Sequence, residues 1–140
     1  MRNKLLYLLI IFSTFFVSNI YAQEINHNGE KWSRITAAEL DTNPDALKYK
    51  KVYLIVENIH TSNNRSSLLG KSYFSFSTHN KNSSLKLWVS RSKKKVLDLL
   101  YNFTSREYRL KLFLEVKRKR RNAYAGYEYF VIIKDCIKTN

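Results

Sequence analysis

The chain has 140 residues, of which 44% are hydrophobic and 14% aromatic, with three Gly, one Pro and one Cys. This length fits one domain, and the composition excludes a disordered, collagen-like or low-complexity chain. Three glycines are too few for a family built on glycine-rich phosphate loops, and a lone cysteine excludes an intrachain disulfide.

The chain is strongly basic, with a formal net charge of +14. Such an excess favours attraction to polyanions, which include nucleic acid, anionic lipid headgroups and acidic cell-surface polymers. The alternative is compositional, because the many Lys, Asn, Ile, Tyr and Phe residues are also the mix that an A/T-rich coding bias produces.

The first 22 residues are predicted to be a signal peptide. Arg2 and Lys4 precede an uncharged run that ends at Val17, and Ala22 supplies the small residue of a cleavage site. We expect cleavage before Gln23 and export to the periplasm or the cell exterior. The alternative is an uncleaved anchor, although the run is shorter than the roughly 20 residues that span a bilayer. No Cys lies near this exit, which excludes the bacterial lipoprotein route.

Residues 23–48 are expected to form a leader with a short helix. The stretch from Gln23 to Trp32 is polar and without period, which indicates an extended or loosely attached segment. Thr36-Ala-Ala-Glu39 has the spacing of a capping box and predicts a helix start. The helix cannot continue through Asn43-Pro44, where Asn43 as N-cap and Pro44 at the first position can begin a new turn.

From Lys51 the apolar residues alternate, which predicts strands with one face on a core. The first strand directs Val52, Leu54 and Val56 inward and is followed by a polar loop at 61–67. A turn at 79–84 separates the second and third strands. Their inward residues are Phe74, Phe76, Leu85, Leu87 and Val89. Their outward residues are Tyr73, Ser75, Ser77, Lys86, Trp88 and Ser90.

An amphipathic helix of about three turns follows, with Ser92 as its expected N-cap. Its apolar face consists of Val96, Leu99, Leu100 and Phe103. A fourth strand is predicted over 108–117 and a fifth over 127–133, and the loop between them contains Lys117 to Arg121. The inward residues of the fourth strand are Leu110, Leu112, Leu114 and Val116. We expect Cys136 to be a half-buried inert thiol, the alternative being an intermolecular disulfide.

The order strand, strand, strand, helix, strand, strand favours a mostly β chain that closes into a barrel plugged by its helix. It is the order of the five-stranded OB-fold, a Greek-key barrel, which we place over residues 49–140 after the short N-terminal helix. The string Ala38-Glu-Leu40, Asn43-Pro44 and Tyr49-Lys-Lys51-Val52 resembles the entry to bacterial exported and lipoprotein OB-fold domains. Those domains usually bend their first strand at a glycine, and Asn58 is expected to take that role here.

Catalysis is not predicted. The histidines His27, His60 and His79 lack the spacing of a metal pair, and nothing resembles a nucleophile elbow or a Cys-His pair. Nucleases built on an OB barrel use acidic calcium ligands near catalytic arginines. The acids in and beside the strands are scattered, and they are Glu57, Glu107, Glu115 and Glu128. We therefore expect a non-enzymatic protein that uses no cofactor and no metal.

OB-folds commonly bind oligonucleotides or oligosaccharides on strands 2 and 3 and on the loops joining strands 1 to 2 and 4 to 5. The candidate ligand-binding residues in these regions are Tyr73, Lys86, Trp88, Arg65, Lys117, Arg118, Lys119, Arg120, Arg121 and Tyr124. Aromatic faces suit base stacking and cations suit phosphates. Alternatively, Tyr73 and Trp88 lie beneath the leader or first helix, and the five adjacent cations form a solvated hairpin that resists aggregation.

A second basic set stands at the start of the long helix, where cations oppose the helix dipole and a bound anion would relieve the conflict. It consists of Arg91, Lys93, Lys94 and Lys95. Together these patterns predict an exported, monomeric OB-fold protein that binds single-stranded nucleic acid or another linear polyanion. The alternative is a structural or protein-interaction module of the cell envelope whose aromatic face docks a partner.

Overall fold

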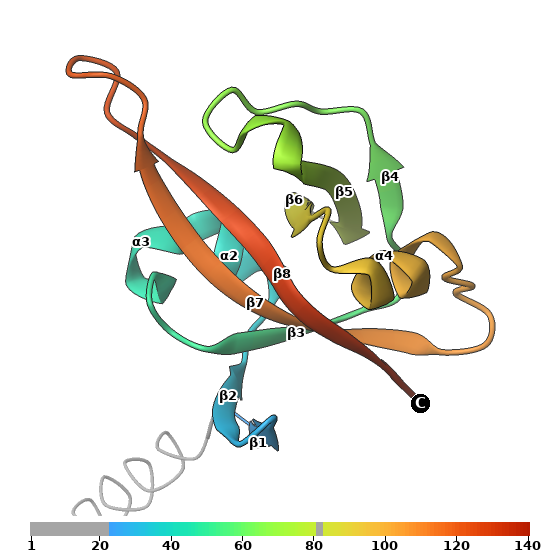
Figure 1. The fold of residues 1–140 in the computed structure, drawn as a ribbon. Helices are drawn as coiled ribbons and strands as arrows, with labels where there is room; N and C mark the ends of the chain where they lie inside the picture. Colours follow the sequence, from blue (N-terminus) through green and yellow to red (C-terminus); the bar gives the residue numbers. More distant parts are fainter. Residues whose placement is uncertain (1–22, 81–82) are drawn as a thin grey trace, which may run out of the picture.

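The computed structural model describes residues 23–80 and 83–140 (Figure 1). The predicted signal peptide therefore lies outside the described residues. The strands are β1 (Glu24–His27), β2 (Glu30–Arg34), β3 (Val52–Val56), β4 (His60–Ser62), β5 (Tyr73–Asn80), β6 (Ser83–Ser90), β7 (Arg109–Arg120) and β8 (Tyr127–Thr139). The helices are α2 (Ala37–Thr42), α3 (Pro44–Leu47) and α4 (Lys94–Tyr101), with a 3-10 turn η1 (Gly70–Ser72).

The eight described strands form one mixed sheet in the order β1-β2-β3-β7-β8-β6-β5-β4. The predicted class, mostly β with short helices, is confirmed, but the predicted count of five strands is too low. Two additions explain the difference. The N-terminal segment forms the hairpin β1–β2, and the segment 52–62, which begins as the first predicted strand and continues into the expected loop, contains two strands, β3 and β4.

The division of the first strand lets the sheet curl into a barrel. β3 pairs with β7, whereas β4 pairs with β5, so the continuous segment 52–62 supplies a strand at each end of the order β3-β7-β8-β6-β5-β4. The strand changes partner at Asn58, where we expected it to bend. Asn58 is not among the described non-glycine residues with positive φ. Its side chain instead bonds the main chain of His79, with Nδ2 donating to the carbonyl oxygen at 2.7 Å and Oδ1 accepting from the amide at 2.8 Å.

The core lies inside this barrel, and the predicted inward faces are confirmed. Leu87, Leu110, Leu112 and Leu114 are fully buried, and Val96 and Leu100 of α4 join the same cluster. Phe74, Leu99 and Phe103 are partly buried against it. The alternation found the core because each of these strands turns one face inward.

The helix starts are confirmed in part. At α2 the Thr36 hydroxyl accepts from the Glu39 amide at 3.2 Å, and the Glu39 carboxylate accepts from the Thr36 amide at 2.6 Å, which completes the capping box. Asn43 and Pro44 begin α3, although Asn43 makes no side-chain cap bond. The prediction of Ser92 as N-cap of α4 is wrong. Lys93 holds that position, while the Ser92 hydroxyl lies 2.8 Å from that of Ser90.

Strand bounds also differ from those predicted. β4 occupies part of the expected loop at 61–67, and β5 and β6 pair through Asn80 and Ser83, which shortens the expected turn. β8 runs six residues beyond the predicted end at 133, because it stays paired with β7 as far as Thr139. No helix among the described residues is long and apolar enough to cross a membrane.

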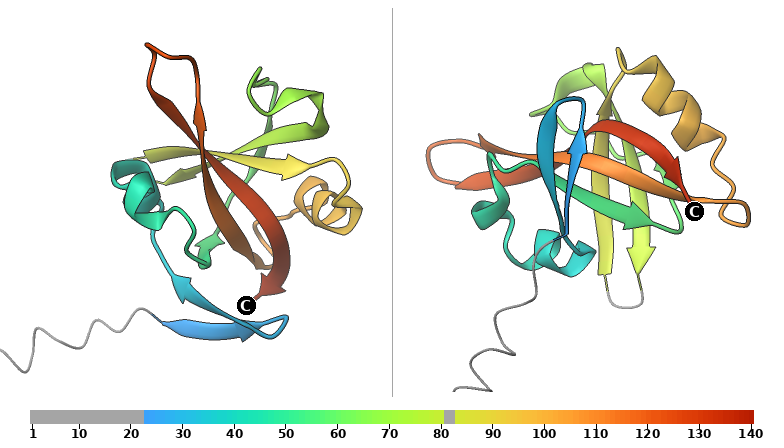
Figure 2. Two further views of the ribbon diagram at one scale, coloured as in Figure 1. Left: turned by 60° about the vertical axis from the view of Figure 1, so that its left-hand side comes forward. Right: turned by 90° about the horizontal axis from the view of Figure 1, so that it is seen from below.

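The polar sequence of the N-terminal segment indicated a loosely attached leader, and this prediction is wrong. The β1–β2 hairpin lies across β3 and β7 (Figure 2), and its Trp32 is buried with Tyr53 and Phe113 in a second cluster. The His27 ring stacks on Phe113, with centroids 3.7 Å apart, and Trp32 meets the same ring edge-on at 5.1 Å. β3 and β7 carry aromatic residues on their outer faces, and the hairpin is what covers them.

Candidate functional site

The outward face of β5 and β6, predicted to bind a ligand, is partly covered by the chain itself. Trp88 is only 5% exposed, which contradicts its assignment to an open face. It packs with Leu69, Phe130 and Ile132, and meets the Phe130 ring edge-on at 6.0 Å. The cover is the segment 63–72 between β4 and β5, which we call the covering loop. Its Leu68 and Leu69 belong to this cluster, so Trp88 has no free ring face for base stacking.

The covering loop is fixed at both ends. The buried Ser75 hydroxyl lies 2.7 Å from the carbonyl oxygen of Ser62 and 2.8 Å from that of Asn64. Near the other end, the Arg91 amide donates to the carbonyl oxygen of Ser72 at 2.9 Å. On this outward face Lys86 stays exposed, opposite Ser77 in the strand register. Tyr73 is half-buried at the margin of the Trp88 cluster.

The cations Lys117 to Arg120 lie in strand β7 rather than in a loop, which corrects the sequence prediction. β7 and β8 stay paired out to Arg120 and Tyr127, and this hairpin projects beyond the barrel (Figure 1). Contacts between the two strands keep these cations in β7, and the Arg118 guanidinium, for example, lies 4.2 Å from the centre of the Tyr127 ring on β8. Of the five cations, Arg121 alone follows the strand.

Three of these five cations have acidic partners. Lys117 Nζ lies 3.9 Å from Glu115, Arg118 Nη1 lies 3.4 Å from Asp45, and Arg121 Nε lies 3.1 Å from Glu128. The Lys119 ammonium donates to the carbonyl oxygen of Leu68 in the covering loop. Much of the hairpin's positive charge is therefore balanced within the protein.

Asp45 connects helix α3 to the base of the hairpin. Its carboxylate accepts from the Tyr129 hydroxyl at 2.8 Å and from the Lys48 ammonium at 3.0 Å, besides facing Arg118. The hydrogen bonds from Tyr129 and Lys48 favour the charged carboxylate and hold the pKa of Asp45 below its ordinary value of 3.8.

A different group of cations surrounds an open pocket beside the covering loop. The pocket has a volume of about 510 Å³, and its lining residues are Arg65, Ser66, Ser67, Gly70, Lys71, Tyr73 and Arg91. An adjoining pocket of about 240 Å³ shares Arg65, Tyr73 and Arg91. No acidic residue lines either pocket. We call Arg65, Lys71 and Arg91 the basic rim.

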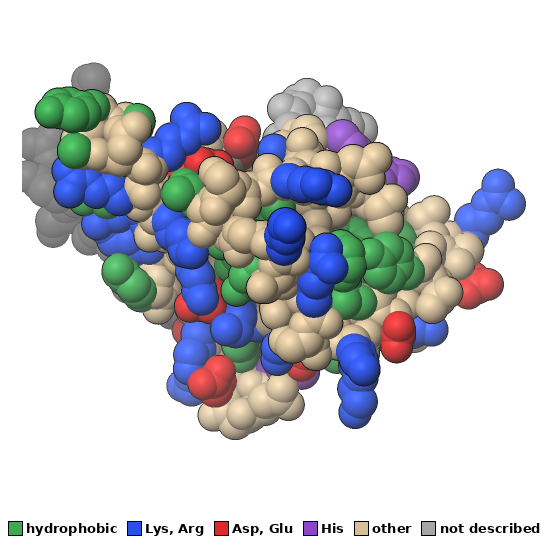
Figure 3. All heavy atoms as spheres, turned by 45° about the horizontal axis from the view of Figure 1, so that its top comes forward, with side chains coloured by type: hydrophobic (Ala, Val, Ile, Leu, Met, Phe, Trp, Pro, Cys, Tyr) green, Lys and Arg blue, Asp and Glu red, His purple; other side chains and the backbone are tan. Residues whose placement is uncertain are grey.

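The basic rim has no internal charge balance. None of its three cations forms an ion pair with a described acidic residue, which distinguishes it from the hairpin. Arg91 is held in place over the ring of Phe74, 4.3 Å from its centre. Figure 3 turns this end of the molecule forward, and Lys and Arg side chains outnumber acidic ones on the face it shows. Of the residues that line this pocket, Arg65 and Tyr73 were predicted as site residues. Arg91 was assigned only to the start of the helix. Lys71 was missed, because the pocket forms only when the covering loop folds back over the sheet.

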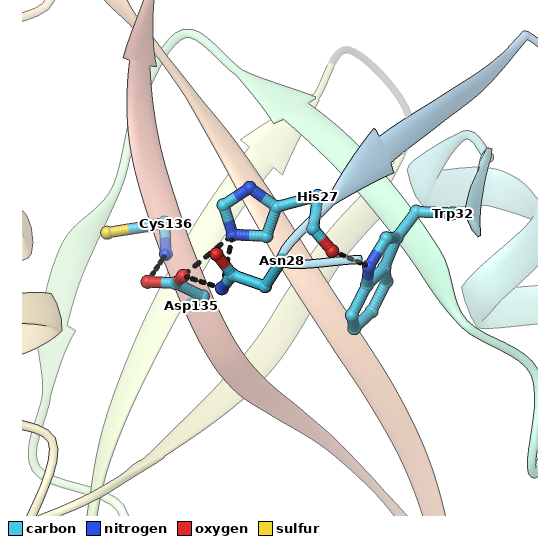
Figure 4. Close-up of polar contacts among 5 residues, drawn as sticks. All are labelled: His27, Asn28, Trp32, Asp135 and Cys136. Atoms are coloured by element: carbon cyan, nitrogen blue, oxygen red, sulfur yellow. Dashed lines mark hydrogen bonds and ion pairs between the residues drawn. The ribbon is translucent and has the colours of Figure 1, made fainter. Parts of the chain in front are cut away.

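A histidine and an aspartate meet where the N-terminal hairpin contacts β8 (Figure 4). Asp135 Oδ2 lies 2.7 Å from His27 Nε2 and accepts from the Asn28 amide group at 3.2 Å. The adjacent Cys136 thiol points into the core, where Sγ lies 3.9 Å from the carbonyl oxygen of Val96. Burial and the Asp135 charge raise the pKa of Cys136 to about 12, so this thiol is not an activated nucleophile.

The other two histidines, His60 and His79, lie together on the surface with ring centroids 5.9 Å apart. Among the described residues, no group of three or more His, Cys, Asp or Glu side chains is arranged to hold a metal ion.

No protein-family model matches the sequence, and no curated protein matches it. Among solved structures, the chain is similar to a putative aspartyl-tRNA synthetase from Leishmania major Friedlin, with 12% identity and a TM-score of 0.49. That similarity covers 93% of this chain and 25% of the synthetase chain, so the protein spans about a quarter of the length of the structure it matches.

Proposed function

We propose that this chain is an exported, non-enzymatic OB-fold binding protein whose ligand is single-stranded nucleic acid or another linear polyanion. The strand order supports the OB-fold. Segment 52–62 acts as a divided first strand, β5 and β6 follow, and α4 connects them to β7 and β8. The β1–β2 hairpin is then an addition to the five-stranded barrel.

The observation that carries the binding function is the unbalanced basic rim. Arg65, Lys71 and Arg91 line one pocket without an acidic partner, and their mutual repulsion is relieved when an anion binds between them. Ser66 and Ser67 add hydroxyl donors to the same pocket. Arginine suits this role because its planar guanidinium binds phosphate in a bidentate manner.

The two pockets beside the covering loop remain open, and they indicate where a ligand strand would lie. A strand that places phosphates against the basic rim reaches the half-buried ring of Tyr73, which lines both adjoining pockets. Trp88 has no part in this path because Leu69 and Phe130 cover it. The alternative function is an envelope module that docks a partner through the aromatic outward face of β5 and β6. The covering loop leaves little of that face accessible, which argues against this alternative.

The test is a fluorescence titration of the protein with a labelled oligothymidylate and, in parallel, with heparin, at two salt concentrations. The variant Arg65→Gln/Lys71→Gln/Arg91→Gln should bind both more weakly. Its salt slope with the oligonucleotide should flatten by about 0.7 for each phosphate that the variant no longer neutralises.

The matched control is Lys31→Gln/Lys50→Gln/Arg106→Gln, which removes the same charge from exposed positions outside both pockets and away from the start of α4. Its affinity should stay near that of the unmodified protein. Equal losses in the two variants would show attraction by net charge alone, and the absence of binding at physiological salt would refute the proposed function.

A further inference from the structure

The end of the β7–β8 hairpin is an exposed aromatic turn with a defined shape. The β8 residue nearest the turn that still pairs with β6 is Val131, and from there the β7–β8 ladder continues without β6 out to Arg120 and Tyr127. Figures 1 and 2 show this end projecting from the barrel. Tyr124 in the turn is 99% exposed.

The turn is held in one conformation by its own polar groups. The Asn122 side-chain oxygen accepts from the main-chain amides of Tyr124 and Ala125. The Arg121 amide donates to the carbonyl oxygen of Gly126 at 3.0 Å, and Gly126 has a φ of 71°, which favours glycine. Tyr124 is thus presented to solvent by an ordered turn.

The end of the hairpin has an uncharged apex and a group of cations next to it in the sequence. The apex, Ala123 to Gly126, has no charged side chain, and Lys119, Arg120 and Arg121 stand directly behind it. The one acidic residue between 117 and 129 is Glu128, which pairs with Arg121. A small apolar apex with a Tyr, followed by cations, matches a bilayer, where Tyr sits among the headgroups and cations meet the phosphates.

The shape of the tip favours a membrane over a nucleic acid strand. A strand binds along grooves lined with several stacking platforms. Here Tyr124 stands at a convex end with alanines on both sides, and the next exposed ring, Tyr127, has the Arg118 guanidinium over one of its faces. A flat surface of many anionic headgroups accepts such a tip without wrapping around it.

We propose that the tip of the β7–β8 hairpin docks on anionic lipid bilayers, with Tyr124 entering the headgroup region while Arg120 and Arg121 contact lipid phosphates. Arg120 has no acidic partner among the described residues, and the Arg121 side chain stays exposed although it pairs with Glu128. This contact is separate from the basic rim and goes beyond the proposed function, because the polyanion pocket stays open while the tip is docked.

The test uses Tyr124→Trp as a fluorescent reporter, since the native Trp32 and Trp88 are both buried. Vesicles of phosphatidylcholine with phosphatidylglycerol should shift the emission of the introduced tryptophan to shorter wavelength and protect it from iodide. Vesicles of phosphatidylcholine alone should not. The matched control is Tyr101→Trp on α4, a half-exposed Tyr away from the hairpin, for which the emission should not change.

Vesicle sedimentation separates this proposal from the first. Replacing Arg120 and Arg121 by Gln should lower anionic-vesicle binding about fivefold for each cation removed. The basic-rim triple variant should keep vesicle binding while it loses oligonucleotide binding. An emission of the Tyr124→Trp variant that anionic vesicles leave unchanged would overturn the proposal. So would a Tyr124→Ser variant that loses oligonucleotide affinity but not vesicle affinity, because the tip would then belong to the nucleic-acid site.

Discussion

The Lys119 ammonium donates a hydrogen bond of 2.8 Å to the main-chain carbonyl oxygen of Leu68. The projecting hairpin and the covering loop, which are far apart in the sequence, are thereby joined beside the buried Trp88. The hairpin and the covering loop were predicted to be two separate ligand-binding loops. This contact instead holds them together on one side of the buried cluster around Trp88.

Removing the apolar cover should expose Trp88. Leu69→Ala deletes a buried side chain of that cluster and should destabilise the protein by about 2 to 5 kcal/mol. Acrylamide quenching of the tryptophan fluorescence should increase, because Trp32 belongs to another cluster and keeps its own cover. The control is Leu68→Ala, a half-buried neighbour, for which both effects should be smaller. Quenching that does not change would show that Leu69 is not the cover.

The barrel core should respond strongly to truncation. Leu87→Ala, Leu100→Ala and Leu112→Ala each empty a buried position on a different element, and each should lower the free energy of unfolding by about 2 to 5 kcal/mol. Urea denaturation measures the change. Ile137→Ala is the control, because this side chain is 37% exposed and its loss should cost less. Costs near zero at the three leucines would mean that the inward faces are assigned wrongly.

The N-terminal hairpin should depend on Trp32. Trp32→Ala removes the ring that packs on Phe113, and it should cost about 3 to 5 kcal/mol if the hairpin folds with the barrel. Hydrogen exchange should then accelerate at the amides of β1 and β2. A milder change, Asp135→Asn, alters the acceptor for His27, Asn28 and the Cys136 amide but removes no buried ring, and it should cost less. Unchanged stability in Trp32→Ala would restore the picture of a loosely attached leader.

The attachment of α3 to the hairpin base should weaken in acid. Because the pKa of Asp45 is lowered in the folded protein, the stabilisation is present above the unfolded value, near 3.8, and is lost as the pH falls through the folded pKa. NMR titration of the Tyr129 and Lys48 signals should show this transition. Asp45→Asn should remove it, and a transition that persists in this variant would assign the effect to another carboxylate.

The local patterns of the sequence were sufficient for the core and the first helix. Leu110 to Val116 alternate over a strand with one face on the core, and the capping box depends on Thr36 and Glu39, which are three residues apart. Interactions of this range can be found by spacing alone. The same holds for the apolar face of α4, where Val96 and Leu100 are one turn apart.

The candidate site was predicted less well because it depends on contacts between distant segments. The burial of Trp88 requires Leu69 to fold back across the sheet, and a polar loop sequence does not reveal this. The basic rim forms only when Lys71 and Arg91 approach each other through the covering loop. The cations of β7 looked like a loop because charged residues are rare in strands, but pairing with Tyr127 and Tyr129 keeps them extended.

The division of the first strand at Asn58 also has a kinetic consequence. β5–β6 and β7–β8 are hairpins between neighbours in sequence, whereas Val52 pairs with Leu114, and this contact requires a much longer loop to close. Contacts between distant segments are slow to form, so we expect the two hairpins to assemble first and the pairing of β3 with β7 to form last. Asn58→Ala, which removes the bonds to His79, should therefore speed unfolding more than it slows folding.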